Sequence, residues 1–423
     1  MALLTPIRTY TQASGAKEFT VLAGGQMLTA LAGLGLGKAM AWYVPPAQLG
    51  QYALGFSGLT AAHVLLVVPI LQAFKAEQAR VGAGAALAFH KPLLVWAYAG
   101  IVGGLVLAGY VAHALPLTLL MSVAVVGQGV QSGALDYLNL TGQPRLYTGF
   151  LVGYALVNLL LFSLWVVCFG PPTALTLWGC LAVANGLFAS LALRAATQRH
   201  KQPNPHPTTQ PLTWRRFRAY ARPLVILAFW GWLINYGDRY LIGLYLTEAD
   251  VGQYSVGYGL GAKLVLLAGP FVAHSSRRVY ALRAANAPLW AVWRVQRTYL
   301  LAYAALGGLA CLVFYLLRYP LGLLLLARTY QTAFTIAPVV AAGYLLLTLI
   351  HLLEVQWYAY GLTKLVLWNN VAGAVANVGF NLLLIPRVGL MGSAYAALLG
   401  FLVQFLVAGL LYSYHLRLSP TPV

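Results

Sequence analysis

The sequence predicts an all-α polytopic membrane protein with about twelve transmembrane helices in two six-helix bundles. Three observations predict this fold class: an apolar composition, a series of apolar runs of membrane-spanning length, and an internal repeat whose two copies have the same orientation. We expect a parallel pseudo-two-fold axis along the membrane normal to relate the bundles.

The composition excludes an ordinary soluble protein. Of the 423 residues, 61% are hydrophobic and 8% are charged, whereas soluble domains are usually about 25% charged. The net charge of +19 does not indicate a nucleic-acid partner, because the basic residues sit in short loops between apolar runs, as the positive-inside rule describes. Such loops also attract anionic headgroups. The lipid bilayer is therefore an expected partner, and no nucleic acid is.

Twelve runs have the length of about 20 residues that a helix needs to cross the bilayer. The first is too long for the core of a signal peptide, so we expect it to remain in the mature protein. Arg318, Tyr319 and Pro320 interrupt the ninth, after which residues 321–327 are either a short membrane-embedded piece or a loop. The expected limits are 19–43, 51–73, 92–113, 115–138, 146–169, 173–196, 223–246, 251–274, 298–317, 333–357, 363–385 and 389–414.

The loops between these runs alternate in charge. One side carries most of the lysines and arginines, while the other carries only Arg318, Arg328 and Arg387 together with the acids Glu248 and Asp250. We expect the basic side to be cytoplasmic. Both termini fall on that side, which an even number of spans requires. We therefore expect a multi-pass membrane protein with cytoplasmic N- and C-termini.

The longest polar stretch separates the two halves of the chain. Residues 197–222 begin with a Pro- and Thr-rich part that is typical of a linker. They end, from Trp214 to Arg222, in a basic amphipathic pattern that predicts a short interfacial helix. We therefore expect an N-terminal six-helix bundle over 1–196, a cytoplasmic linker over 197–222 and a C-terminal six-helix bundle over 223–423.

Two internal echoes give the halves the same orientation. Residues 47–56 (AQLGQYALGF) align without gaps to 249–258 (ADVGQYSVGY), each between an odd span and the next even one. Residues 142–158 align to 361–377, each between the fourth and fifth spans of a half. In transporters with parallel repeats, the substrate site lies between the halves near the bilayer midplane. The repeat therefore favours alternating access by rocking of one bundle against the other.

Gly50 and Gly252 occupy matching places in the first echo. A turn between helices needs a residue that tolerates a positive φ, which glycine does. The tyrosines that follow, Tyr52 and Tyr254, are expected to anchor their rings among the headgroups.

Three short motifs resemble those of a known transporter family. Residues 49–52 (LGQY) look like its L-G-x-x-x-F/Y-G-x-Y signature, although no acidic residue precedes this glycine. Residues 238–243 (DRYLIG) with 251–254 (VGQY) look like the second-half version, and 384–394 (LIPRVGLMGSA) like the last-span motif. The chain is thus similar to the polysaccharide flippases of the multidrug/oligosaccharidyl-lipid/polysaccharide exporter superfamily.

This resemblance implies a V-shaped molecule with a central cavity. It also implies that the protein lies in the bacterial inner membrane, where it flips an undecaprenyl-pyrophosphate-linked oligosaccharide or polysaccharide repeat unit from the cytoplasmic to the outer leaflet. A lipid-linked oligosaccharide is then the substrate, and polysaccharide polymerase or assembly proteins are candidate partners.

Three basic residues fall inside the expected spans, namely Lys38, Arg239 and Lys263. A pyrophosphate needs cations, and its sugars need amides or aromatic rings. These three residues are therefore candidates for substrate binding, together with Asn235, which shares a helix face with Arg239 four residues later. The alternative for Lys38 and Arg239 is that they snorkel to the outer interface.

Three acidic residues are candidates for coupling or gating. Asp238 points about 100° away from its basic neighbour, so we expect it to meet another helix, as a coupling-ion site or as a structural counter-ion. Asp136 and Glu354 lie at equivalent ends of spans four and ten. There they either pair with cytoplasmic basic residues such as Arg145 or Lys364, or form an inner gate.

No catalytic, metal or cofactor pattern is found in the sequence. The three cysteines are single and flanked by apolar residues, as small buried hydrophobes are. We expect no cofactor, while coupling to H⁺ or Na⁺ stays open. Two other functions stay open as well. A cation-coupled multidrug exporter of the same superfamily would rely on an acid in the first or seventh span, and an integral-membrane glycosyl- or acyltransferase would need paired acids or a conspicuous histidine beside a sizeable loop.

Overall fold

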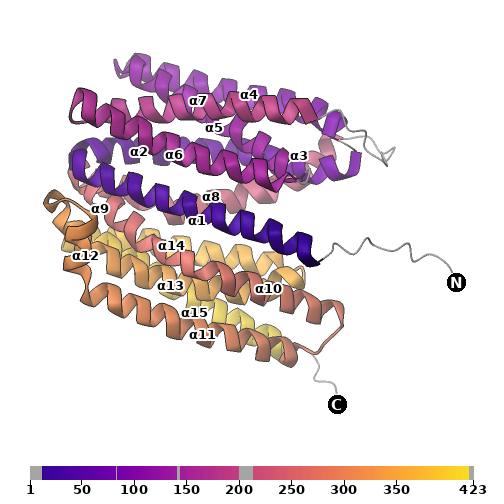
Figure 1. Cartoon of the computed structure of the whole chain (residues 1–423). Helices are drawn as coiled ribbons and strands as arrows, with labels where there is room; N and C mark the ends of the chain where they lie inside the picture. The colour runs from indigo at the N-terminus through magenta and orange to yellow at the C-terminus, as the bar shows by residue number, and fades with distance from the viewer. Residues whose placement is uncertain (1–11, 82, 141–142, 200–212, 419–423) are drawn as a thin grey trace. The chain divides into compact units, whose positions relative to one another are not determined.

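The structure is a computed structural model that describes residues 12–81, 83–140, 143–199 and 213–418. These residues are almost entirely helical and include no strand, which confirms the all-α fold class (Figure 1). The helices are α1 (Gln12–Tyr43), α2 (Pro46–Ala62), the π-helical turn η1 (His63–Val67), α3 (Val68–Val81), α4 (Ala83–Val111), α5 (Leu115–Leu140), α6 (Pro144–Phe169), α7 (Ala174–Arg199), α8 (Trp214–Tyr245), α9 (Glu248–Gly261), the 3-10 turn η2 (Ala262–Leu267), α10 (Ala268–Ala284), α11 (Leu289–Leu316), α12 (Arg318–Leu325), the 3-10 turn η3 (Arg328–Tyr330), α13 (Gln331–Ala359), α14 (Thr363–Val388) and α15 (Leu390–Leu418).

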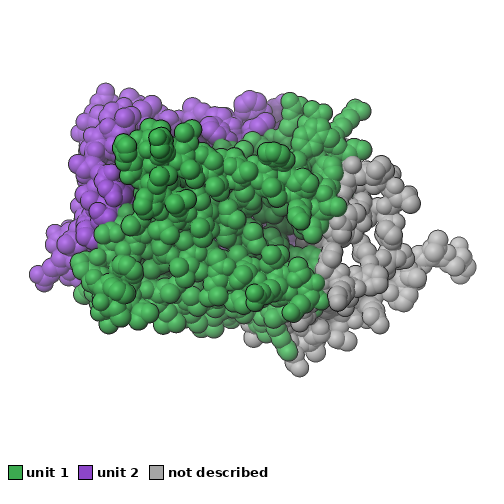
Figure 2. All heavy atoms as spheres, turned by 90° about the horizontal axis from the view of Figure 1, so that it is seen from above, with its two compact units in different colours: residues 1–43, 62–225 green, residues 44–61, 226–423 purple. Residues whose placement is uncertain are grey.

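The chain forms two compact units, which Figure 2 distinguishes by colour. Unit 1 comprises residues 1–43 and 62–225, and unit 2 comprises residues 44–61 and 226–423. All of α2 except its last residue, Ala62, therefore belongs with the second half of the chain. Residues 214–222 form the first turns of α8 and not a separate helix, while residues 200–212 of the expected linker lie outside the described residues. The bundle limits 1–196 and 223–423 stay predictions.

Nine helices within the described residues are long and apolar enough to cross a membrane, and the bent pair α9–α10 makes a tenth. That pair bends by 44°. The two helices at the expected first and seventh spans, α1 and α8, have 32 residues each and complete the expected twelve. α1 carries Gln26 and Lys38, and α8 carries a charged pair, within otherwise apolar runs. Residues after the ninth span continue as the short helix α12.

Unit 2 is built around α13, most of whose residues are buried. Small residues allow its neighbours to come close. A Cβ on Gly261 of α9 would lie 2.4 Å from the backbone oxygen of Ala337, and a Cβ on Gly257 would lie 3.0 Å from that of Ala333. Lipid gives helices no hydrophobic reason to associate, so such close approach supplies the van der Waals contact that holds them together. α13 therefore fixes the position of α9.

The two glycines of the first echo lie against each other inside unit 2. A Cβ on Gly50 would lie 1.8 Å from the backbone oxygen of Glu248, and a Cβ on Gly252 would lie 2.0 Å from that of Pro46. Both glycines are helical, and neither is among the described glycines with a positive φ, which are Gly170, Gly361 and Gly389. The expectation of a positive φ was wrong: these positions need glycine because α2 and α9 cross at backbone distance.

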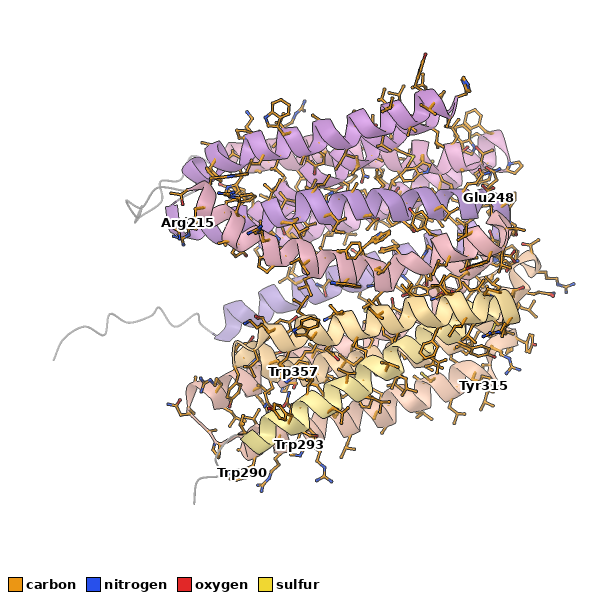
Figure 3. The ribbon with its side chains drawn as sticks, turned by 180° about the vertical axis from the view of Figure 1, so that it is seen from behind. Arg215, Glu248, Trp290, Trp293, Tyr315 and Trp357 are labelled. Atoms are coloured by element: carbon orange, nitrogen blue, oxygen red, sulfur yellow. The ribbon has the colours of Figure 1, made fainter. Side chains whose placement is uncertain are left out.

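Tyr254 is not a headgroup anchor, contrary to our expectation. Its side chain is 0% exposed and belongs to the core of unit 2. The aromatic and charged groups at the ends of this unit are other residues. Glu248 and Tyr315 lie at one end of unit 2, and Trp290 and Trp293 lie at the other (Figure 3). Trp290 stacks with the guanidinium of Arg294, at 4.8 Å, an arrangement suited to the membrane interface.

The contact between the two glycines predicts a large difference between two alanine variants of α9. Gly252→Ala places a methyl group against the carbonyl of Pro46 and should lower the free energy of unfolding by about 1–3 kcal/mol. Gly259→Ala is the matched control, because a Cβ there meets nothing within 4 Å. It should stabilise the helix slightly. Thermal unfolding of the purified protein measures both, and equal melting temperatures would disprove the close crossing.

Candidate functional site

The candidate site lies within unit 2, where α8 meets α9. Thr247 and Asp250 fix the start of α9 by a reciprocal cap: the Thr247 backbone N–H donates to Asp250 Oδ2 at 3.1 Å, and the Asp250 N–H donates to Thr247 Oγ1 at 3.2 Å. Such a capping box satisfies two free amides. Trp232 ties α8 to α2 by donating to the backbone oxygen of Ser57 at 2.9 Å. These contacts hold the helices that carry the charged pair.

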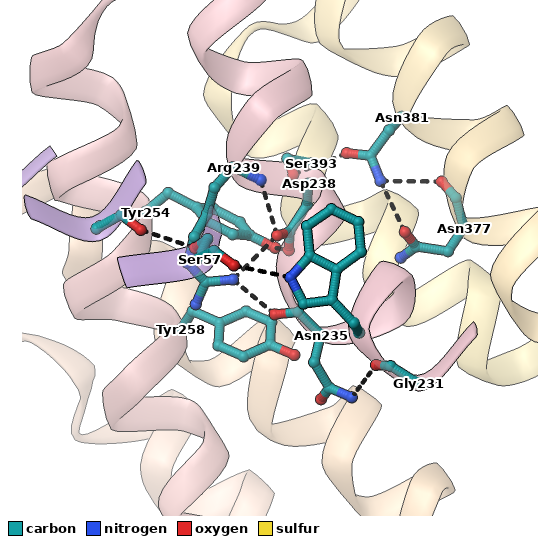
Figure 4. A network of polar contacts seen from close by, with 12 residues as sticks. Ser57, Gly231, Asn235, Asp238, Arg239, Tyr254, Tyr258, Asn377, Asn381 and Ser393 are labelled. Carbon is teal, nitrogen blue, oxygen red and sulfur yellow. Dashed lines mark hydrogen bonds and ion pairs between the residues drawn. The ribbon is translucent and has the colours of Figure 1, made fainter. Parts of the chain in front are cut away.

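Asp238 is 1% exposed, and both of its carboxylate oxygens accept hydrogen bonds (Figure 4). Oδ1 accepts from the backbone N–H of Arg239 at 2.8 Å and from its Nη1 at 3.1 Å. Oδ2 accepts from the Tyr254 hydroxyl of α9 at 2.5 Å. Asp238 thus meets another helix, as the sequence predicts. The expectation that it would not meet its neighbour was wrong, because the long arginine side chain folds back along the helix.

Arg239 is 8% exposed, and its guanidinium has both hydrogen-bond and aromatic partners. Its Nη1 donates to the backbone oxygen of Asn235 at 2.6 Å. Its guanidinium lies 5.0 Å from the ring centre of Tyr236 and 4.8 Å from that of Tyr258, and tyrosine faces attract cations. Asn235 and Arg239 do share a helix face, but the Asn235 amide donates to the Gly231 backbone oxygen at 2.7 Å.

A chain of buried amides lies close to this pair in unit 2 (Figure 4). The Asn381 amide donates to the backbone oxygen of Asn377 at 2.9 Å and to its side-chain oxygen at 3.2 Å. Ser393 donates to Asn381 Oδ1 at 2.8 Å. Buried polar groups in lipid must find such partners, because no water is there to replace them. The amides therefore tie α14 to α15.

The other two basic candidates have surroundings of their own. Lys38 belongs to unit 1, where its ammonium is 5.9 Å from the ring centre of Trp42. Lys263 lies in η2, between α9 and α10 of unit 2. Both side chains are exposed. Among the candidates of unit 2, the structure brings together Asn235, Asp238 and Arg239.

The acidic candidates at the ends of spans four and ten differ in their partners. In unit 1, Asp136 pairs with Lys75 at 2.6 Å, which is a basic partner, as one of the two alternatives predicts, although not the Arg145 given as an example. In unit 2, Glu354 accepts from the Asn369 amide at 3.3 Å, and no Lys or Arg is recorded in an ion pair with it. The expected Lys364 partner was wrong, because α14 presents an amide where Glu354 packs. Glu354 also lines a cavity of about 390 Å³.

Several residues of the site escaped the sequence-based prediction. The repeat singled out Tyr254 but gave it the wrong role, and nothing drew attention to Tyr258 or Ser393. The spacing of Asp238 and Tyr254 crosses a turn between helices, so no helical periodicity relates them. Among the described residues no group of three His, Cys, Asp or Glu side chains is placed to hold a metal ion.

The buried pair predicts a specific pattern of stabilities. Asp238→Leu leaves a guanidinium without its counter-ion inside the bundle and should lower the free energy of unfolding by about 3–5 kcal/mol. Adding Arg239→Leu removes the orphaned charge and should recover much of that loss. Thermal unfolding of the two single variants and the double variant gives the coupling, and strictly additive effects would contradict the pairing.

Comparisons with known proteins identify the fold. No protein-family model matches the chain, and no curated protein sequence matches it. Solved structures do match. An inward-facing multidrug resistance MATE family transporter of the MOP superfamily superposes with a TM-score of 0.71 at 12% identity, covering 95% of this chain and 98% of the other. The lipid II flippase MurJ in an inward closed conformation gives 0.66 at 12% identity, covering 93% and 87%.

A MOP superfamily transporter from Pyrococcus furiosus gives a TM-score of 0.60 at 13% identity, covering 95% of this chain and 94% of the other. MATE and MurJ proteins have a twelve-helix fold of two lobes. At these identities the similarity concerns the fold. The chain therefore has the fold of the MOP superfamily of transporters.

Proposed function

We propose that the protein is a membrane transporter that flips an undecaprenyl-pyrophosphate-linked oligosaccharide from the cytoplasmic to the outer leaflet by alternating access. The observation that favours flipping most is the state of Asp238, the one acid of the seventh span. Both of its oxygens are occupied within the protein, so no free carboxylate awaits a cationic drug there. The fold shared with a lipid II flippase supports the same proposal.

The chemistry of such a substrate limits what the protein must do. Its lipid tail can stay in the bilayer, and only the pyrophosphate and the sugars have to cross. A pyrophosphate is bound by exposed cations. Lys38 and Lys263 have exposed side chains on helices that we assign to spans one and eight, whereas Arg239 is committed to Asp238. We therefore assign headgroup binding to the two lysines and give Arg239 and Asn235 a supporting role in this conformation.

A cation-coupled multidrug exporter is the second candidate, and one observation favours it. Glu354 is 4% exposed and lines a cavity without a basic partner, so it could hold a cation. Coupling of transport to H⁺ or Na⁺ is compatible with both candidates, and Asp136 and Glu354 are the acids we propose for coupling or gating. A transferase is disfavoured, since no paired acids lie beside a large loop in the described residues.

The charge distribution leads us to propose an orientation in the bacterial inner membrane. With twelve spans, both termini face the cytoplasm, as does the α10–α11 end that carries Arg283 and Arg294. Fusions of alkaline phosphatase, which is active only outside the cytoplasm, should be inactive after residue 418 and active after Leu317. The opposite pattern would reverse the proposed direction of transport.

Removal of the exposed cations tests the flippase. Lys38→Gln and Lys263→Gln should each slow flipping of a fluorescent undecaprenyl-pyrophosphate-linked oligosaccharide in proteoliposomes by about tenfold, because each removes a charged hydrogen bond to phosphate. Melting temperatures should stay unchanged, since both side chains are exposed. Lys364→Gln, exposed at the start of α14, is the control and should keep the wild-type rate.

Two outcomes would count against this proposal. Normal flipping by the double variant Lys38→Gln/Lys263→Gln would remove the lysines from the substrate site. Gradient-driven uptake of ethidium by the same vesicles, with no flipping of the lipid-linked oligosaccharide, would favour the drug exporter.

A further inference from the structure

A second polar region of unit 2 is separate from the charged pair. It is a cavity of about 390 Å³, which falls in the range of about 300–1,000 Å³ typical of ligand pockets. Four helices line it, each with one face. α10 contributes Val272, Ser276 and Tyr280 at intervals of four residues. The complete lining is Leu227, Gly231, Val272, Ser276, Tyr280, His351, Glu354, Val355, Tyr358 and Asn370.

The wall of this cavity offers unused hydrogen-bonding groups. Glu354 is 4% exposed, and Asn369 donates to its Oε1 while Oε2 has no hydrogen-bond partner among the described residues. The side chains of Ser276, Tyr280, Tyr358 and His351 likewise make no hydrogen bond to the part of the chain that the structure describes. Of these residues only Glu354 is buried, whereas Ser276 is half-buried and Tyr280, Tyr358 and His351 are exposed. Buried polar groups are normally paired, so the free carboxylate oxygen of Glu354 is the group that indicates a polar ligand or the water that holds its place.

The kinds of group in the wall select the ligand. No Lys or Arg lines the cavity, and the Glu354 carboxylate would repel a phosphate. A simple cation would use acceptors alone, yet the hydroxyls of Ser276, Tyr280 and Tyr358 can all donate as well as accept. A sugar ring uses donors and acceptors together. Its C–H faces also suit the rings of the two tyrosines, which are apolar bodies with a polar tip.

The position of the cavity matches the loading side of a flippase. It lies near the C-terminal ends of α10 and α13 and near the N-terminal end of α14. The same ends carry Arg277, Arg278 and Lys364, so the positive-inside rule makes this side cytoplasmic. A substrate headgroup assembled in the cytoplasm would meet this cavity first.

We propose that this cavity binds one sugar ring of the substrate's oligosaccharide, with the Glu354 carboxylate accepting from sugar hydroxyls and Tyr280 and Tyr358 covering the ring. The inference rests on the proposed function and deepens it, because it separates the site of the sugar from the lysines assigned to the pyrophosphate.

Saturation-transfer NMR on the full-length protein in nanodiscs tests the proposal, because it detects weak binding of free sugars. The probes are glucose, galactose, rhamnose, N-acetylglucosamine and N-acetylgalactosamine. We expect transfer to at least one of them. Glu354→Gln and Tyr358→Ala should each weaken it by about tenfold through loss of a hydrogen bond to a charged group or of the ring contact.

Two control variants make the same chemical changes at positions that do not line the cavity. Glu248→Gln alters an acid at the other end of unit 2, and Tyr414→Ala removes an exposed tyrosine of α15 that does not line the cavity. Both should leave the transfer unchanged. Melting temperatures of all variants are measured in parallel, and Tyr280→Ala serves as a second cavity variant should Glu354→Gln fail to fold.

Three results would overturn the proposal. The first is no saturation transfer to any sugar, and the second is transfer to a sugar that none of the cavity variants weakens. The third is transfer to tetraphenylphosphonium and to no sugar, if Glu354→Gln abolishes that transfer. The last would support the drug exporter. Because this measurement does not depend on flipping, normal flipping without sugar binding would disprove only the cavity, and sugar binding without flipping would disprove only the proposed function.

Discussion

The buried pair of Asp238 and Arg239 constrains the rest of unit 2. An uncompensated charge in a membrane bundle is costly, so the carboxylate and the guanidinium need partners inside the protein. Tyr254 supplies the remaining hydrogen bond to Asp238, and Tyr258 supplies a ring face to Arg239. Both tyrosines come from α9, and their positions depend on its cap at Thr247 and on its approach to α13 through Gly257 and Gly261. The charge pair therefore determines which face of α9 points inward.

The same helix explains why the repeat is visible in the sequence. α9 crosses α2 where Gly252 meets Gly50, and each glycine would collide with the backbone of the other helix if it had a side chain. Two related segments thus pack on each other with matching residues, and Gln51 of one echo donates to Glu248 at the start of the other at 2.8 Å. The two copies of the echo contact each other directly, and this contact gives a physical reason for their matching glycines.

The fold could be predicted from the sequence because each of three features is related to the bilayer. The length of the apolar runs indicates the spans, the charge of the loops indicates the side on which each loop lies, and the repeat indicates the orientation of the two halves. The helices α1 and α8 were found as well, since their polar residues lie within otherwise apolar runs. The site was accessible only in part. Helical periodicity placed Asn235 and Arg239 on one face, but it could not show that an arginine folds back onto its neighbour. It also could not relate Asp238 to Tyr254, because a turn intervenes.

Unit 2 contains two polar regions, the pair of Asp238 and Arg239 and the cavity at Glu354, and they are suited to different roles. Both carboxylate oxygens of Asp238 already accept hydrogen bonds, so a ligand that binds this carboxylate would have to replace contacts within the protein. The cavity at Glu354 already holds unpaired donors and acceptors, so a ligand there adds contacts without breaking any. Residues 276 and 280 lie beyond residue 274, the expected end of the eighth span, so the sequence did not place them on one helix face with residue 272. What distinguishes this face of α10 is that α13 brings a carboxylate and a tyrosine to it and α14 brings an amide. We therefore assign sugar binding to the cavity at Glu354 and a structural role to the pair of Asp238 and Arg239.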